Sequence, residues 1–226
     1  MKIDLDRIAF IGRTFHEYFH MFDLDDGLLR GRVLDCPGGA SSFTAECAKQ
    51  GCDATACDIL YGIEPGKLIE KARADTAYAL EQAYKVKDLY DWGFYGSVEG
   101  HAAQRSAALR HFSADFPAGI GEGRYVQGEL PRLPFQDGAF SLVLSSHFLF
   151  LYSDRLDFQF HRDCLMELLR VGRQVRVYPL AGLDGKQYPL LDNLLSALSS
   201  SGAQARVCRT PFRFMREADK MLVLTR

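Results

Sequence analysis

Residues 32–58 have the pattern of a strand, a tight turn, a helix and a second strand, and this pattern limits the fold more than any other feature. Residues 32–35 are a short run that ends in an acid, and residues 37–39 read Pro-Gly-Gly. Residues 41–50 are typical of a helix that stops at a glycine, and residues 54–58 of a second short strand. A β-α-β unit of this kind predicts parallel strands joined by a right-handed crossover.

The same alternation of strands and helices continues to the C-terminus. Further strands are predicted at residues 124–128, 140–147, 174–180, 204–210 and 220–226, with helices at 157–172 and 190–202. The last two strands follow each other without a helix, so we expect them to form an antiparallel pair. The whole pattern predicts an α/β fold, namely a doubly wound, Rossmann-like sheet of seven mainly parallel strands.

One connection is too long for a single crossover helix. Asp58 and Glu129 are 71 residues apart, and the sequence between them has two long stretches with apolar residues at helical spacing. We therefore expect an inserted helical lid at residues 62–123, between the second and third strands. Residues 1–30 are rich in aromatic side chains and are predicted to form an N-terminal helical cover. Residues 1–226 are interpreted as one domain.

Composition excludes several classes of function. The formal net charge is −2 and the pI is about 6.3, so no broad basic surface points to nucleic acid. The first ten residues lack a signal-peptide pattern, and no apolar run approaches the roughly 18 residues that would span a bilayer. We therefore expect a cytoplasmic protein without a membrane partner. The six cysteines form no C-x-x-C pair, and we expect buried thiols and no metal.

The glycine turn at residues 37–39 lies where ligands bind to doubly wound sheets, at the carboxyl end of the first strand. A phosphate-binding loop requires Gly-Lys-Ser/Thr, and a dinucleotide fold requires G-x-G-x-x-G; neither occurs here. Asp35 would also repel a pyrophosphate. An acid followed by glycines favours a ligand with a positively charged end, although a purely structural turn would have the same residues.

VLDCPGGAS, at residues 33–41, resembles the first motif of the class I S-adenosylmethionine-dependent methyltransferases, an acid followed by a glycine turn. Pro37 and Ser41 replace the outer glycines of that motif. The stretch from residue 125 to residue 152, YVQGELPRLPFQDGAFSLVLSSHFLFLY, is similar to the region of this family that holds the third and fourth strands. The family resemblance implies S-adenosyl-L-methionine as cofactor.

The resemblance also implies a set of cofactor-binding residues. The turn would line the methionine moiety, and Asp58, at the end of the second strand, would accept the ribose hydroxyls. Glu129 and Leu130, after the third strand, would meet the adenine. The predicted cofactor-binding residues are Asp35, Cys36, Pro37, Gly38, Gly39, Asp58, Ile59, Glu129, Leu130, Ser145, Ser146 and, from the N-terminal cover, Arg13 and Tyr18.

The fourth strand ends in Ser145, Ser146 and His147, which should face the transferred methyl group. His147 is the candidate catalytic base or orienting group, because histidine exchanges protons near neutral pH; packing against the cofactor is the alternative. Aromatic and basic side chains of the lid could enclose a small substrate and meet an anionic group on it. The predicted substrate-binding residues are Trp92, Tyr95, His101, Arg105 and Tyr152.

These features predict an enzyme, a methyltransferase that acts on a small-molecule acceptor. Three alternatives stay open: a protein that binds the cofactor without transferring methyl, a methyltransferase for RNA or protein, and a nicotinamide dehydrogenase. The last of these lacks the glycine motif that it would require. The oligomeric state stays open as well.

Overall fold

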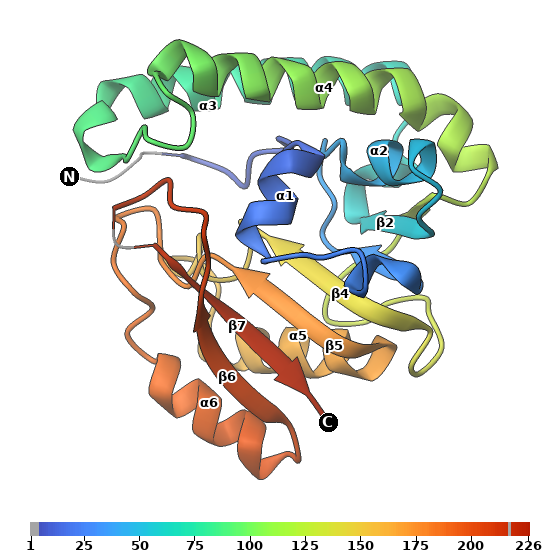
Figure 1. Cartoon of the computed structure of the whole chain (residues 1–226), viewed down its shortest axis with the longest axis vertical. Coiled ribbons are helices and arrows are strands. Elements are labelled where there is room, and N and C mark those ends of the chain that lie inside the picture. Colours follow the sequence, from blue (N-terminus) through green and yellow to red (C-terminus); the bar gives the residue numbers. More distant parts are fainter. Residues whose placement is uncertain (1–4, 217) are drawn as a thin grey trace.

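The computed structural model describes residues 5–216 and 218–226, and its centre is a seven-stranded sheet (Figure 1). The strand order is β3-β2-β1-β4-β5-β7-β6, and β7 runs antiparallel to both of its neighbours. The other pairs are parallel. The predicted doubly wound, mainly parallel sheet with an antiparallel C-terminal pair is confirmed. Its strands are β1 (Val33–Asp35), β2 (Ala54–Asp58), β3 (Tyr125–Gln127), β4 (Phe140–Ser146), β5 (Gly172–Tyr178), β6 (Gln204–Arg209) and β7 (Lys220–Thr225).

Helices cover both faces of the sheet because successive strand residues point to opposite sides. In β4, Val143 packs with α5 and α6 on one face, whereas Leu142 and Leu144 pack with α1 and α2 on the other. The α-helices are α1 (Phe15–Met21), α2 (Phe43–Lys49), α3 (Pro65–Lys85), α4 (Val98–Gly121), α5 (Phe158–Val171) and α6 (Leu191–Ser200), with 3-10 turns at Leu28–Arg30, Ile59–Gly62 and Lys87–Leu89.

The predicted insertion between β2 and β3 is a hairpin of the two longest helices, α3 and α4, which pack against each other (Figure 1). Local sequence sets where each helix begins. Glu64 caps α3 by accepting hydrogen bonds from the backbone N–H groups of residues 66 and 67, and Ser97 caps α4. Phe112 and Phe116 of α4 pack on Tyr61 and Tyr125, which anchors the hairpin over β2 and β3.

The N-terminal cover is less helical than predicted. Residues 1–4 lie outside the described residues, residues 5–14 have no helix, and α1 begins only at Phe15. The backbone N–H of Phe10 donates to Asp75 of α3 at 2.9 Å, and the N–H of Ala9 donates to the Tyr152 hydroxyl at 3.1 Å. These tertiary partners take the place of helical hydrogen bonds. We call residues 5–13 the N-terminal segment.

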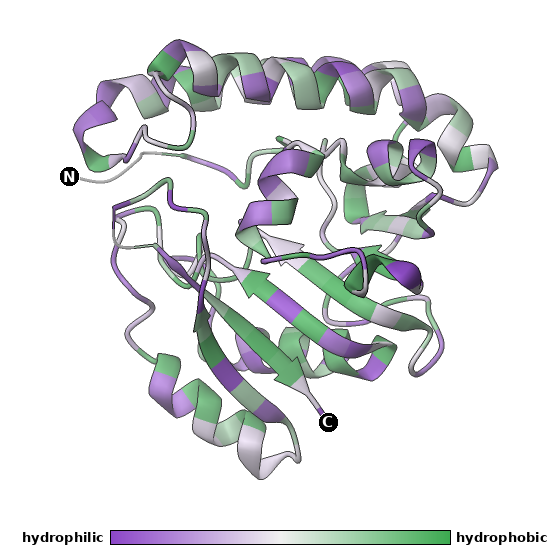
Figure 2. Cartoon of the chain, in the orientation of Figure 1, coloured by the Kyte–Doolittle hydropathy of each residue, from purple (hydrophilic) through white to green (hydrophobic). Residues whose placement is uncertain are grey.

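The strands of the sheet differ in hydropathy and exposure. Figure 2 shows β4 and β7 coloured mainly as hydrophobic, whereas β6 carries hydrophilic positions along its length. β6 is one of the two edge strands, and four of its six residues are exposed. Two of these are Arg206 and Arg209, charges that discourage pairing with another chain. Among the described residues, no helix has the length and apolar character needed to cross a membrane.

Candidate active site

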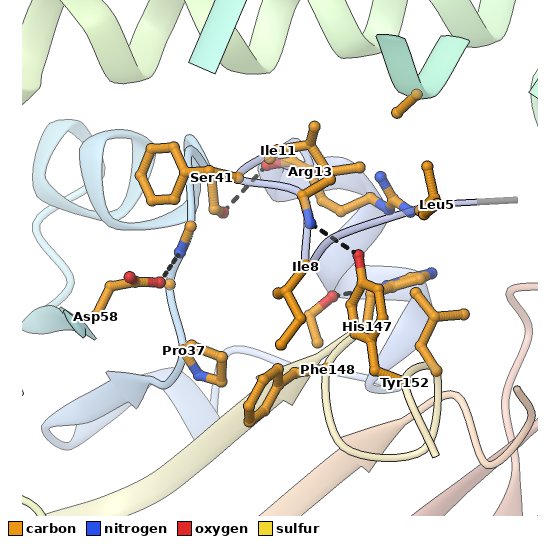
Figure 3. A pocket seen from close by; sticks show the side chains of 18 of the residues that line it. Leu5, Ile8, Ile11, Arg13, Pro37, Ser41, Asp58, His147, Phe148 and Tyr152 are labelled. Carbon is orange, nitrogen blue, oxygen red and sulfur yellow. Dashed lines mark hydrogen bonds between the residues drawn. The ribbon is translucent and has the colours of Figure 1, made fainter. Parts of the chain in front are cut away.

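A cavity of about 560 Å³ lies over the carboxyl ends of the parallel strands (Figure 3). Cys36 follows β1, Asp58 ends β2, Gly128 follows β3 and His147 follows β4, and all four line it. The N-terminal segment, the α3–α4 hairpin and the β6–β7 connection complete the walls. This edge is where doubly wound sheets bind ligands, and the volume is in the range of small-molecule sites.

Most of the predicted site residues lie together in this cavity. Residues from six separate regions of the sequence meet there, because the turns after β1, β2, β3 and β4 converge at one edge of the sheet. The predicted residues that line the cavity are Arg13, Tyr18, Cys36, Pro37, Gly38, Gly39, Asp58, Ile59, His101, Arg105, Glu129, Leu130, Ser146, His147 and Tyr152.

Four predicted site residues are not among those that line the cavity. Asp35 is fully buried, and both of its carboxylate oxygens accept from the Tyr18 hydroxyl, at 2.9 and 3.1 Å. Ser145 is also fully buried. Tyr95 donates its hydroxyl to Glu17, and Trp92 donates its ring N–H to the Lys87 carbonyl and borders a separate shallow pocket. Asp35 therefore lies behind the cavity wall, where it holds the hydroxyl of Tyr18, a residue that lines the cavity.

The glycine turn is not bare, because the N-terminal segment lies against it. Gly39 has a φ of +55°, and a Cβ there would be 2.7 Å from the carbonyl oxygen of Ile11. A Cβ on Gly12 would collide with the backbone of Ala40. Position 39 therefore requires glycine for two reasons: its φ is positive, and the N-terminal segment lies too close to leave room for a side chain.

Replacing Gly39 with Ala is expected to cost about 2–4 kcal/mol of unfolding free energy, because a left-handed conformation and a steric overlap both oppose the side chain. Gly51→Ala is the matched control. Gly51 has a φ of +77° and open space around its Cβ position, so about 1–2 kcal/mol is expected. Urea unfolding measures both variants. Equal losses would show that the N-terminal segment does not press on the turn.

Asp58 is held in place by backbone donors. Its Oδ1 accepts from the N–H of Leu60 at 2.9 Å and its Oδ2 from the N–H of Gly39 at 3.0 Å. Burial raises the pKa of Asp58, although the two backbone hydrogen bonds work in the opposite direction. Each carboxylate oxygen can accept a further hydrogen bond, so neighbouring hydroxyl groups such as those of a ribose match this acceptor.

The neighbouring wall is more open. Ile59 is 48% exposed and Glu129 is exposed, while Leu130 is buried with its side chain in the main core. All three line the cavity beside Asp58. An apolar surface next to an acid suits a flat heterocycle with an amino group.

A buried ion cluster lies on another wall. Glu17 of α1 pairs with Arg105 of α4, and its Oε1 is 3.9 Å from Nε of Arg13. Arg105 also donates to the Gly12 carbonyl. Burial by itself would raise the pKa of Glu17, but the charges of Arg105 and Arg13 outweigh it and lower the pKa to about 2. Glu17 is therefore ionised at neutral pH.

Two histidines line the cavity in neutral form. Burial lowers the pKa of His101 to about 2, and the charges of Arg105 and Arg13 add to that effect. Burial and the same arginines hold the pKa of His147 well below its ordinary value. Nδ1 of His147 is 2.9 Å from the Ser146 hydroxyl, and the residue has a φ of +52°. A positive φ is uncommon in non-glycine residues, and strained residues of this kind cluster at functional sites.

Sequence reasoning missed part of the site. The sequence analysis does not single out Glu17, although it follows Arg13 by four residues, a spacing that would place both on one face of the helix predicted there. Residues 5 and 7–13 of the N-terminal segment line the cavity as extended chain, although the sequence predicts a helix there. Phe214 and Met215, in a connection without a recognisable motif, also line it, whereas Glu17 reaches the cavity only through the arginines that it pairs with. Among the described residues, no group of three or more His, Cys, Asp or Glu side chains could hold a metal ion, and the six cysteines are free.

Comparisons with known proteins agree with this architecture. No protein-family model matches the chain. It is 31% identical over 225 residues to the uncharacterized protein MJ0045 of Methanocaldococcus jannaschii, and the alignment covers 99% of both proteins. It is also similar to the solved structure of the mitomycin 7-O-methyltransferase MmcR, at 13% identity and a TM-score of 0.50, over 94% of this chain and 53% of that one. A TehB-like S-adenosylmethionine-dependent methyltransferase from Corynebacterium glutamicum has 16% identity and a TM-score of 0.43, over 87% of this chain and 80% of that one.

The likeness to MmcR concerns the fold, and with the sheet order it confirms the predicted class I methyltransferase architecture. The identity to MJ0045 extends along almost the whole of both proteins. This protein therefore has the fold of the S-adenosylmethionine-dependent methyltransferases, and it belongs to the same family as MJ0045 of Methanocaldococcus jannaschii.

Proposed function

We propose that the protein is an S-adenosyl-L-methionine-dependent methyltransferase that acts on a small-molecule acceptor. The observation that carries this proposal is Asp58, a buried carboxylate at the end of β2, facing a cavity formed by the turns after β1, β3 and β4. The methyltransferase fold supports the same reading. A cavity of about 560 Å³ is of the size that holds small molecules, which favours a small acceptor over a polymer.

The residues present fit the cofactor by the chemistry of their donors and acceptors. Asp58 would accept the ribose hydroxyls, and Ile59, Glu129 and Leu130 would surround the adenine. The glycine turn and Tyr18 would border the methionine moiety. When bound, the cofactor supplies an electrophilic methyl group on a positively charged sulfur, so the chain needs to provide mainly orientation and exclusion of water.

His147 is the side chain of this chain best placed to receive a proton from an acceptor. It follows β4, lines the cavity and has a ring nitrogen within 2.9 Å of the Ser146 hydroxyl. Its lowered pKa keeps the ring neutral at pH 7, so a ring nitrogen can accept a hydrogen bond from the acceptor, while the same shift makes the ring a weaker base.

The test of the proposed function is calorimetric titration of the purified protein with S-adenosylmethionine, S-adenosylhomocysteine and NAD. We expect micromolar binding of the first two and none of NAD, followed by transfer of a labelled methyl group in a screen of small acceptors. Binding without transfer to small molecules, RNA or protein would instead identify a cofactor-binding protein. Folded protein that binds neither methionine ligand would refute the proposal.

His147→Asn is expected to lower turnover by about 10²–10⁴-fold if the histidine takes a proton, since that is the usual contribution of a general base. Asn also tolerates a positive φ, so the backbone should hold. Affinity for S-adenosylhomocysteine should stay within twofold. Because the pKa of His147 is well below its ordinary value, its protonation state does not change between pH 6 and 8. Wild-type turnover should therefore show no pH dependence from His147 in that range. Unchanged turnover in the variant would leave His147 a packing role.

A further inference from the structure

The buried ion cluster carries more positive than negative charge. Arg105 is paired directly with Glu17, and Glu17 is the only carboxylate with a salt bridge to Arg13 or Arg105 in the part of the chain that the structure describes. His101, on the same wall, is neutral at pH 7. One carboxylate cannot neutralise two guanidinium groups, so the cluster keeps one surplus positive charge. Glu17 lies closer to Arg105 than to Arg13, which leaves Arg13 the less well compensated of the two.

The polar atoms of this wall also lack hydrogen-bond partners. Arg13 is 8% exposed, Arg105 3% and His101 4%. Nε of Arg13, Nε of Arg105 and Nδ1 of His101 are buried with no hydrogen-bond acceptor among the described residues. All three side chains line the cavity. A desolvated cation with unused donors is costly unless a ligand supplies the missing negative charge.

The position of the cluster separates it from Asp58. The His101 ring stacks on Phe214 at 4.6 Å between ring centres, and Phe214 precedes β7. In the sheet order, β7 lies beyond β4 and β5, whereas Asp58 ends β2 on the other side of β1. Figure 3 likewise shows Asp58 and His147 on opposite sides of the cavity. With the cofactor's ribose at Asp58, the half of the cavity near His147 remains for the acceptor.

The walls of this second half are apolar. The N-terminal segment contributes to them, together with the connections that follow β4 and β5. Leu5, Leu183 and Tyr152 are buried together, with Phe148 and Leu151 packed against them. An apolar surface beside a single uncompensated cation selects a molecule that has an apolar body and one negative group.

We propose that Arg13, Arg105 and His101 form an anion subsite that binds the carboxylate of an apolar acceptor and thereby orients it for methyl transfer. The inference rests on the proposed function, since it assigns the subsite to the acceptor. It also moves Arg13 from the cofactor-binding set, where the family resemblance placed it, to the acceptor. Arg13 provides the surplus charge, His101 a neutral N–H donor, and Arg105 remains bound to Glu17 while offering its free Nε–H. The carboxylate is an anchor in this arrangement, and the methylated atom lies elsewhere on the molecule.

The test compares carboxylates with neutral molecules of the same shape. Octanoate and 3-phenylpropanoate, each with its primary amide, are titrated calorimetrically into the wild-type protein saturated with S-adenosylhomocysteine. We expect each carboxylate to bind at least tenfold more tightly than its amide. In Arg13→Met this preference should fall below twofold. Arg73→Met removes the same charge from an exposed position of α3 and should retain the full preference.

Two results would overturn the proposal. Equal binding of carboxylates and amides by the wild-type protein would do so, and that measurement needs no variant to fold. The second result is a change in cofactor affinity. If Arg13→Met weakens binding of S-adenosylmethionine but not of decarboxylated S-adenosylmethionine, the subsite holds the cofactor's own carboxylate and the proposal is overturned. Titration with S-adenosylmethionine alone separates the anion subsite from the proposed function. If the protein does not bind S-adenosylmethionine but still prefers carboxylates to amides without a cofactor, only the proposed function is lost.

Discussion

Replacing Glu17 with Gln is expected to lower the free energy of unfolding by about 3–5 kcal/mol, because two buried guanidinium groups would lose their shared counter-ion. Glu17 is fully buried and holds four parts of the structure together. It pairs with Arg105 of α4, accepts from the Tyr95 hydroxyl, and accepts from both the N–H and the hydroxyl of Thr14 at the start of α1. Its Oε1 also faces Arg13.

Urea unfolding at pH 7 measures this loss, with Glu81→Gln as the matched control. Glu81 pairs with Lys85 on α3, but both side chains are more than half exposed, at 65% and 57%. A surface pair of this kind contributes less than about 1 kcal/mol. A loss below 1 kcal/mol in Glu17→Gln would show that the buried cluster is hydrated or arranged differently.

The stabilisation by Glu17 should also depend on pH in a defined direction. Its pKa is lowered in the folded protein from about 4.5 to about 2, so the folded state favours the ionised form. The contribution is therefore complete above pH 4.5 and is lost as the pH falls from 4.5 towards 2. The difference in stability between wild type and Glu17→Gln should shrink over this window. A constant difference down to pH 2 would contradict the ion pairing.

Replacing Asp58 with Asn is expected to weaken S-adenosylhomocysteine binding by about 100-fold. A hydrogen bond to a charged acceptor contributes about 1.5–3 kcal/mol, and two ribose hydroxyls would donate to this carboxylate. The Asn side chain has one acceptor oxygen where Asp has two. The N–H groups of Gly39 and Leu60 would compete with the ribose hydroxyls for that single oxygen. Calorimetry measures the affinity, and the melting temperature of the free protein checks that the fold is retained.

Asp53→Asn serves as the control, because Asp53 precedes β2 and its ion pair with Arg32 lies at the surface. Its affinity should match that of the wild type. Because burial raises the pKa of Asp58, lowering the pH should protonate Asp58 before ordinary aspartates and weaken S-adenosylhomocysteine binding by the wild type. The affinity of Asp58→Asn should not change over that pH range. Affinity within twofold of wild type in Asp58→Asn would remove this residue from the site.

The sequence by itself determined the order of the elements and the edge of the sheet where the site lies. Strand periodicity, the glycine turn and the helix stops are local features, so the β-α-β unit and the position of Asp58 at the end of β2 follow from neighbouring residues. The α3–α4 insertion followed from the length of the connection between β2 and β3 and from its helical spacing, both of which can be read along the sequence.

Only the tertiary structure decided which side chains meet. Arg13 and Glu17 come from the start of the chain and Arg105 from α4, so their cluster depends on packing between elements about 90 residues apart in sequence. The N-terminal segment is non-helical because its N–H groups find Asp75 and Tyr152, partners that no local pattern reveals. The surplus positive charge beside Arg13 likewise becomes costly only after folding has removed water from it, because burial is what makes an uncompensated cation unfavourable.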